Sequence, residues 1–143
     1  MERFKLHAAV FLILQKGKKV LLQRRFQTGH QDGNYGLISG HLERDEPATQ
    51  TLVREAKEEA GIIVNSKHLK LKHVMHKRGD PAEYINIFYL SNTWEGKPKI
   101  MEEDKCDDLS WFPVNKLPKN TISYIKKAIE NIKKEIFYSE FGW

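Results

Sequence analysis

The sequence predicts one mixed α/β or α+β domain over residues 1–143. Three observations favour this fold class: a continuous apolar run near the start, further segments with strand composition, and two stretches in which apolar residues recur at helical spacing. Of the 143 residues, 40% are hydrophobic, so the chain can build a core without disulfide bonds. The order in which strands and helices alternate along the chain indicates a sheet combined with helices.

The first two strands are expected at residues 8–14 and 19–25. Residues 8–14, AAVFLIL, are apolar throughout, which is typical of a strand covered on both faces. Residues 19–25 have the composition of its hairpin partner. Residues 26–39 are rich in Gly, Asn, Asp and Gln and therefore predict a long loop. Because long loops in compact domains are usually functional, we expect this one to border a site.

A helix of about 14 residues is expected next, with Pro47 at its first position and Gly61 as its stop. Apolar residues recur between these two positions at helical spacing. Strand composition returns at residues 69–77 and 84–94, which the turn sequence KRGDP separates. A further short strand is expected to include residues 109–114.

The end of the chain predicts an amphipathic helix. Isoleucines from Ile122 to Ile136 recur every three or four residues, with lysines on the other side and Asn120 available as a cap. The aromatic C-terminal segment YSEFGW is expected to dock on the domain, and a homodimer contact is the alternative.

Composition excludes several classes of protein. Cys106 is the only cysteine, so neither an intramolecular disulfide nor a cysteine-based zinc site can form, and we expect a reducing, cytoplasmic location. The longest apolar run is far shorter than the roughly 20 residues of a spanning helix, and no small-residue cleavage site follows it. We therefore expect neither a membrane anchor nor a signal peptide.

The charge of the chain favours small acidic ligands. Its 24 Lys and Arg residues exceed its 19 Asp and Glu residues, giving a net charge of +5. The lysines are spread in pairs and form no basic block, so duplex nucleic acid is not an expected partner. A nucleotide remains a suitable ligand.

Three carboxylates crowd one face of the first predicted helix. Glu55, Glu58 and Glu59 occupy positions i, i+3 and i+4, within an arc of about 100°. Like charges at this spacing repel, so the helix needs a compensating cation unless each side chain is solvated. Carboxylate oxygens suit Mg²⁺ or Mn²⁺. For the glutamate run alone, a solvated helix face would be the better interpretation.

The wider spacing around the glutamates changes that interpretation. Seven fixed identities at this spacing would coincide about once in 10⁸ random windows at residue frequencies of roughly 6 to 7%. The segment GHLERDEPATQTLVREAKEEAGI, at 40–62, resembles the signature of the Nudix hydrolase family at every fixed position. The rest of the chain is similar more loosely, in its strand order, its segment WFPVNKLP and its terminal helix.

This resemblance implies a fold and an activity. The fold is an α/β/α sandwich with a mixed β-sheet and a loop-helix-loop catalytic module. The activity is Mg²⁺-dependent hydrolysis of a nucleoside diphosphate linked to another moiety, with ordinary or oxidised nucleoside triphosphates among the candidates. The resemblance implies metal ligation by Glu55, Glu58 and Glu59, helped by the carbonyl of Gly40. Glycine suits position 40 because a side chain would obstruct the approach of the backbone to the ion.

Other positions of the signature have supporting roles by the same resemblance. Glu46 is not expected to be a direct metal ligand but to contact the ion through water. Arg54 is expected to hold the glutamates in register. Glu55 is the first choice as proton acceptor, with a loop acid among residues 102–104 as the second.

Five residues are candidates for substrate binding. Arg24 and Arg25 end the second strand, where guanidinium groups suit phosphate oxygens, although both could be plain surface charges. Tyr35 stands where the family commonly has Trp, near the expected leaving group, and Ile38-Ser39 replaces the usual Pro-Gly. Asn86 lies in an apolar strand and needs a partner, such as a base edge, the backbone or water. Glu103 of the acidic loop completes the set.

Two other functions compete with hydrolysis. A nucleotide-sensing or regulatory module could keep the fold and bind without turnover, but such modules usually lose catalytic glutamates and none is missing here. A prenyl diphosphate isomerase on the same scaffold is disfavoured because Cys106 has no evident supporting site. His30 and His41, beside the long loop, are expected to face solvent, and contact with a phosphate is the alternative.

Overall fold

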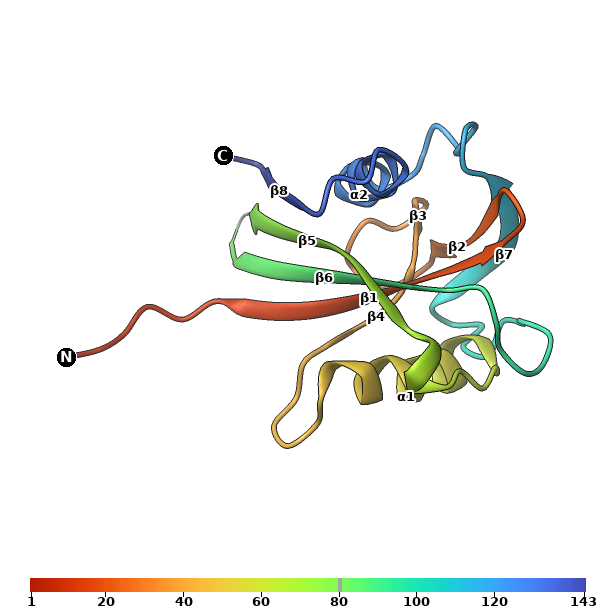
Figure 1. Cartoon of the computed structure of the whole chain (residues 1–143), viewed down its shortest axis with the longest axis horizontal. Helices are drawn as coiled ribbons and strands as arrows, with labels where there is room; N and C mark the ends of the chain where they lie inside the picture. The colour runs from red at the N-terminus through yellow and green to blue at the C-terminus, as the bar shows by residue number, and fades with distance from the viewer. Residues whose placement is uncertain (80) are drawn as a thin grey trace.

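A computed structural model describes residues 1–79 and 81–143 (Figure 1). Within these residues an eight-stranded mixed sheet lies between two helices, with α1 (Ala48–Ala60) on one side and α2 (Ser123–Lys133) on the other. This arrangement confirms the predicted fold class. The turn KRGDP contains residue 80, so that prediction lies partly outside the described residues.

Strand β1 (His7–Lys16) is the centre of the sheet. It pairs in parallel with β6 (Glu83–Ser91) and antiparallel with β2 (Lys19–Arg25) and β4 (Ile38–His41). Its middle residues, 10–14, are all at most 6% exposed, because both faces of the strand are covered. The continuous apolar run and the hairpin are therefore confirmed.

The remaining strands extend the sheet in both directions. The strands β2 and β6 each carry further neighbours, and residues 138–141 near the C-terminus form the outermost strand of one side, which confirms that the C-terminal segment docks on the domain. The other bounds are β3 (Tyr35–Gly36), the short 3-10 helix η1 (Ser66–His68), β5 (Lys70–Arg78), β7 (Cys106–Pro113) and β8 (Tyr138–Phe141). The order along the main path is β3-β2-β1-β6-β5-β8, with β4 on β1 and β7 on β2.

Each face of the sheet has its own core, because side chains alternate along β1. On one face Phe11 stacks on Phe88 and packs with isoleucines of α2. On the other face Leu12 packs with Leu52 and Ala56 of α1. Burial of these apolar faces fixes both helices against the sheet.

Helix α1 is 13 residues long and begins one residue later than expected. Pro47 has an extended backbone and precedes the first helical residue, while its carbonyl accepts bonds from the backbone N–H groups of Gln50 and Thr51. Gly61 ends the helix with a φ of 66°, and its N–H donates to the carbonyl of Lys57. A left-handed C-terminal residue of this kind favours glycine.

The predicted loop over residues 26–39 is shorter than expected. Residues 35–36 and 38–41 form β3 and β4, which pair with β2 and β1. The glycine-rich composition does not predict these two strands, because they are short and are stabilised by pairing with residues far away in the sequence.

The terminal helix also differs from the prediction. It ends at Lys133, so Ile136 lies outside it and is 42% exposed. Asn120 is not its cap; its side chain donates to the carbonyl of Gly33. Glu135 has a φ of 58°, and this turn redirects the chain so that β8 can pair with β5. Strand pairing thus overrides the isoleucine periodicity. None of the described helices is both long and apolar enough to cross a membrane.

Candidate active site

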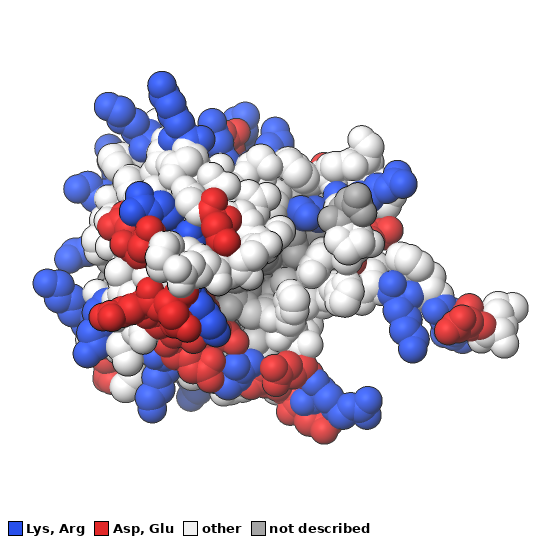
Figure 2. All heavy atoms as spheres, turned by 180° about the vertical axis from the view of Figure 1, so that it is seen from behind, with Lys and Arg blue, Asp and Glu red and all other residues white. Residues whose placement is uncertain are grey.

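Helix α1 presents two of its glutamates to a cleft beside β4. The apolar side of the helix packs on the sheet, and Glu55 and Glu59 line the cleft together with residues 39–41 of β4. The cleft has a volume of about 780 Å³ and also receives residues of β1, β5, β6 and α2. Seen from behind, acidic side chains gather over the lower half of the molecule, where α1 lies in Figure 1, with Lys and Arg around them (Figure 2). The charged residues that line the cleft are Arg25, Glu43, Glu55, Glu59, Lys77 and Glu102.

Glu59 is held in the cleft by donors from two strands. The side-chain amide of Gln23 donates to Glu59 Oε1 at 2.7 Å, and the backbone N–H of Ser39 donates to Oε2 at 3.3 Å. Burial raises the pKa of Glu59 well above its ordinary value, and the neighbouring Glu55 adds to this shift, while the two donors oppose it. The site thus fixes a poorly hydrated carboxylate, which a cation would stabilise.

Arg54 connects the glutamates of the module. Its Nε and Nη2 each donate to a different oxygen of Glu46 at 3.0 Å, and its Nη1 donates to Glu55 Oε1 at 2.8 Å. The bonds from Arg54 and from Thr51 lower the pKa of Glu46, and Glu46 contributes most to raising the pKa of Arg54. Arg54 therefore contacts both Glu46 and Glu55.

Gly40 lies against Glu55. A Cβ atom at position 40 would stand 2.7 Å from Glu55 Cγ and 3.0 Å from Oε1, so any other residue would displace this carboxylate. The absence of a side chain at position 40 thus lets the carboxylate of Glu55 lie against the backbone of β4. Such a set of hard oxygen donors fits Mg²⁺ or Mn²⁺.

Glu58 stands apart from the other two glutamates of the helix. Its side chain is 52% exposed, accepts a bond from Arg54 at 3.4 Å and does not line the cleft. Over residues 1–79 and 81–143, no three His, Cys, Asp or Glu side chains are close enough together to form a ready metal site. The structure brings together Gly40, Glu55 and Glu59, with Glu58 at the rim.

Basic and aromatic groups share the cleft with the glutamates. Burial and the positive charges of Arg25 and Lys77 lower the pKa of His30, and all three residues line the cleft. Burial also lowers the pKa of Lys77, whose Nζ lies 4.7 Å from the ring centroid of Tyr124. His30 and His41 are exposed, as expected, and both line the cleft. The cleft therefore offers both carboxylates and cations to a ligand.

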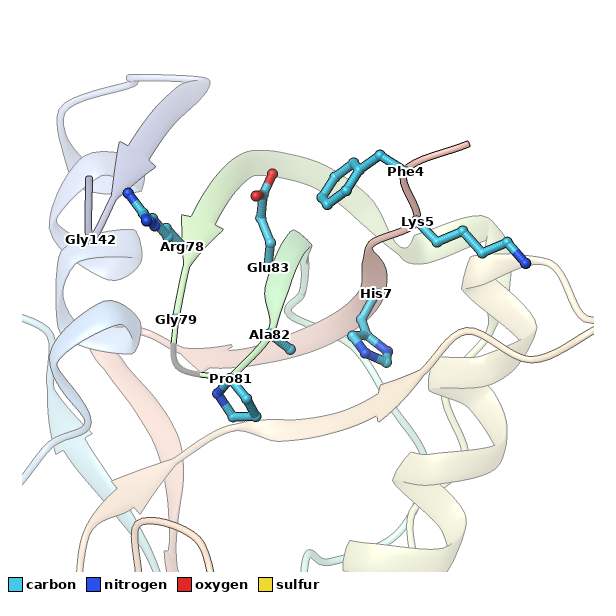
Figure 3. Close-up of a pocket in the computed structure, with 9 residues that line it drawn as sticks. All are labelled: Phe4, Lys5, His7, Arg78, Gly79, Pro81, Ala82, Glu83 and Gly142. Carbon is cyan, nitrogen blue, oxygen red and sulfur yellow. The ribbon is translucent and has the colours of Figure 1, made fainter. Parts of the chain in front are cut away.

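A second hollow adjoins the cleft, between the N-terminal arm and the turn from β5 to β6 (Figure 3). It has a volume of about 710 Å³ and shares four lining residues with the cleft. Its carboxylate, Glu83, bonds His76 at 2.6 Å, and Arg78 lies over the ring of Trp143. The shared residues, which make the hollow an extension of the cleft, are His7, Gly79, Pro81 and Ala82.

Three expected substrate-binding residues lie outside the cleft. Arg24 pairs with Asp107 at 2.7 Å, because neighbouring residues of β2 point to opposite faces and only Arg25 reaches the cleft. Tyr35 is 8% exposed, and its hydroxyl donates to Asp108. Glu103 is exposed, whereas its neighbour Glu102 lines the cleft. Of the expected set, the structure places Arg25 and Asn86 at the cleft.

The family model of the NUDIX domain matches residues 4–132. The chain belongs to this family. A solved structure described as a MutT NUDIX hydrolase from Burkholderia pseudomallei superposes with a TM-score of 0.82 and 23% identity, covering 89% of this chain and 98% of the other. At that identity the superposition supports the fold of this Nudix protein.

Relatives of this Nudix protein are named as enzymes. It is 30% identical over 126 residues to an ADP-ribose pyrophosphatase of Methanocaldococcus jannaschii, covering 87% of this chain and 73% of the relative. It is 34% identical to an 8-oxo-dGTP diphosphatase of Proteus vulgaris, covering 68% and 85%. It spans only 37% of a longer relative, an NAD-capped RNA hydrolase NudC of Pseudomonas entomophila, at 32% identity over 77% of this chain. The chain is an enzyme of the hydrolase class that acts on acid anhydrides.

Several residues of the site of this Nudix protein were not predicted. Gln23, which bonds Glu59, lies in a strand that composition alone predicts, and the available signal was a polar residue inside KVLLQRR. Tyr84, Lys77 and Tyr124 come from the strand pair β5–β6 and from α2, which no local pattern connects to the signature. Their convergence depends on the sheet order.

Tyr35 has a structural role that can be tested. We expect Tyr35→Phe to lower the free energy of unfolding by about 1.5 to 3 kcal/mol, because a bond to a carboxylate is lost, and to leave turnover within about twofold. Burial and the bond to Asp108 raise the pKa of Tyr35 to about 12. The stabilisation is therefore complete below pH 10 and is lost as the pH rises toward 12. Urea unfolding of both proteins from pH 8 to 12 measures it, and a large loss of turnover would contradict the assignment.

Gln23 is expected to position Glu59. We expect Gln23→Leu to weaken Mn²⁺ affinity and turnover by about tenfold, since groups that orient metal ligands typically contribute at least this much. Calorimetric Mn²⁺ titration measures the affinity. The control is Gln15→Leu, whose side chain bonds the carbonyl of Gly17 and is absent from the cleft. Equal Mn²⁺ affinity in the two variants would exclude the role.

Proposed function

We propose that this Nudix protein is a metal-dependent pyrophosphohydrolase that cleaves a nucleoside diphosphate linked to another moiety, with Mg²⁺ as the ion and Mn²⁺ as a substitute. The observation that carries the proposal is the half-buried carboxylate of Glu59 beside Glu55 and the bare backbone of Gly40, at one cleft. Ligand pockets commonly have volumes of about 300 to 1,000 Å³, and the cleft falls in this range at about 780 Å³.

The residues present fit a divalent ion. Members of the family generally use a divalent metal. Glu55 and Glu59 would hold it from inside the cleft, with the carbonyl of Gly40 and with Glu58 from the rim. When bound, such an ion neutralises non-bridging phosphate oxygens and lowers the pKa of an attacking water.

The chain itself orients the reacting groups. Glu55 is the proposed proton acceptor, because it lies in the cleft and Arg54 fixes one of its oxygens at 2.8 Å. Glu102 is the alternative acceptor, since it is the acid of its loop that lines the cleft. Arg25 and Lys77 would contact phosphate oxygens, which guanidinium and ammonium groups bind well.

The substrate is proposed to be a small nucleotide derivative such as those named for the relatives, ADP-ribose and 8-oxo-dGTP. The buried Cys106, which forms no disulfide, supports the proposed cytoplasmic location.

A hydrolysis screen tests the proposal. The purified chain is incubated with Mg²⁺, Mn²⁺ or EDTA and a panel of ADP-ribose, NAD, sugar nucleotides, dinucleoside polyphosphates, dGTP and 8-oxo-dGTP. We expect nucleoside monophosphate to be released from at least one member, with no release in EDTA. No product from any member contradicts the proposal. Calorimetric binding of a nucleotide without product would instead support the regulatory module that binds without turnover.

A further inference from the structure

Asn86 carries an unpartnered polar atom at the cleft. The residue lies in β6, is 2% exposed and lines the cleft. Its Oδ1 atom is buried and has no hydrogen-bond partner among the described residues. Because buried polar side-chain atoms nearly always have a partner, this oxygen is an acceptor available to a ligand.

The surroundings of Asn86 suit a flat aromatic group. Tyr84 lies two residues earlier in the same strand and so points to the same face of the sheet. Phe11 and Tyr124 pack edge to face at 6.1 Å between ring centroids, and all three aromatic residues line the cleft with Asn86. Nucleobases stack on aromatic side chains of this kind.

We propose that Asn86 Oδ1 accepts a hydrogen bond from the exocyclic amino group of a nucleobase, so that the enzyme prefers substrates whose base carries such a group. This inference rests on the proposed function, because it places the base of the substrate in the same cleft as the glutamates. An exocyclic amino group projects from the ring and can reach an acceptor in the cleft wall. A base with only carbonyl oxygens at that edge would bring two acceptors together.

The effect of Asn86 on stability distinguishes a role in binding a nucleobase from a role in stabilising the fold. An asparagine kept for stability would have partners, and its removal would leave another group unsatisfied. Asn86 has none for Oδ1 within residues 1–79 and 81–143, so we expect Asn86→Leu, which is similar in size, to melt at the same temperature as the parent protein or higher. The matched control is Asn131→Leu in α2, where Nδ2 is also buried and unpartnered among the described residues but the cleft is not involved.

Binding of nucleoside monophosphates tests the proposal without turnover or metal. Two pairs are compared by calorimetry, AMP with purine riboside 5′-monophosphate and GMP with IMP, because the members of each pair differ only in the amino group. We expect at least one pair to show about tenfold tighter binding of the amino member, as a good contact to a base edge provides. Asn86→Leu is expected to make the members of that pair equal, whereas Asn131→Leu keeps the preference.

The outcomes of this binding experiment test the role of Asn86 independently of the proposed hydrolase activity. Equal binding within both pairs, no binding of any of the four ligands, or a preference that persists in Asn86→Leu overturns the assignment of Asn86. A preference that disappears only in Asn86→Leu supports it, even if the hydrolysis screen yields no product. Turnover without any base preference would leave the pyrophosphohydrolase proposal standing and remove this one.

Discussion

Replacement of Glu59 by glutamine is expected to lower kcat by at least about 100-fold. The amide keeps the size of the side chain and can still bond a neighbour, but it cannot neutralise a divalent ion beside Glu55 and Gly40. Steady-state kinetics at saturating Mg²⁺, with the best substrate of the hydrolysis screen, measures the loss. The control is Glu43→Gln, in which an exposed carboxylate of the same cleft is changed. Full activity of Glu59→Gln would contradict the ligand assignment.

The same substitution is expected to stabilise the metal-free protein at neutral pH. Burial raises the pKa of Glu59 above its ordinary value of 4.5, so the folded state favours the protonated acid. The protonated Glu59 side chain contributes fully to the free energy of unfolding below pH 4.5, and this contribution is lost as the pH rises through the pKa of Glu59 in the folded state. The wild-type protein in EDTA should therefore melt below Glu59→Gln at pH 8, and the difference should shrink toward pH 4. Scanning calorimetry across this range measures both effects, and a lower melting temperature of the variant at pH 8 would contradict this account of the site.

The elements that the sequence predicted well depend on local patterns. Strand β1 is apolar at every position from 8 to 14 because both of its faces are covered. Helix α1 follows from apolar residues at helical spacing and from Gly61, whose left-handed backbone ends it. The contacts of Arg54 with Glu46 and Glu55 also span few residues, so the spacing of the signature brings these side chains together.

The residues that the sequence predicted less well depend on long-range pairing. The choice between Arg24 and Arg25 is made by the register of β2 on β7, which shifts between these two residues. Tyr35 is buried because Asp108, 73 residues later, accepts its hydroxyl. Lys77 and Tyr124 reach the cleft only when β5 and α2 are in place. One sequence contains no local signal for such pairings, since the residues that meet are far apart in the chain.

Replacement of Arg54 by lysine is expected to lower kcat by about 100-fold, at the upper end of the range for groups that orient metal ligands. The guanidinium donates to both oxygens of Glu46 at 3.0 Å and to Glu55 at 2.8 Å, each from a different nitrogen. The ammonium group of lysine has a single nitrogen and cannot reproduce the geometry of these three bonds. The net charge of the protein is unchanged, so a lower kcat would reflect the lost orientation of Glu46 and Glu55. Arg44→Lys, in an exposed position of the preceding loop, is the control.

A double-mutant cycle distinguishes orientation from a general loss of structure. If Arg54 acts through Glu46, then Glu46→Gln and Arg54→Lys disrupt the same pair of bonds, and the double variant should be little worse than Arg54→Lys alone. Additive losses would show that the two residues act independently. If both single variants need a different Mn²⁺ concentration for half-maximal activity, the effect involves the proposed metal ligand Glu55, because Arg54 bonds both Glu46 and this carboxylate.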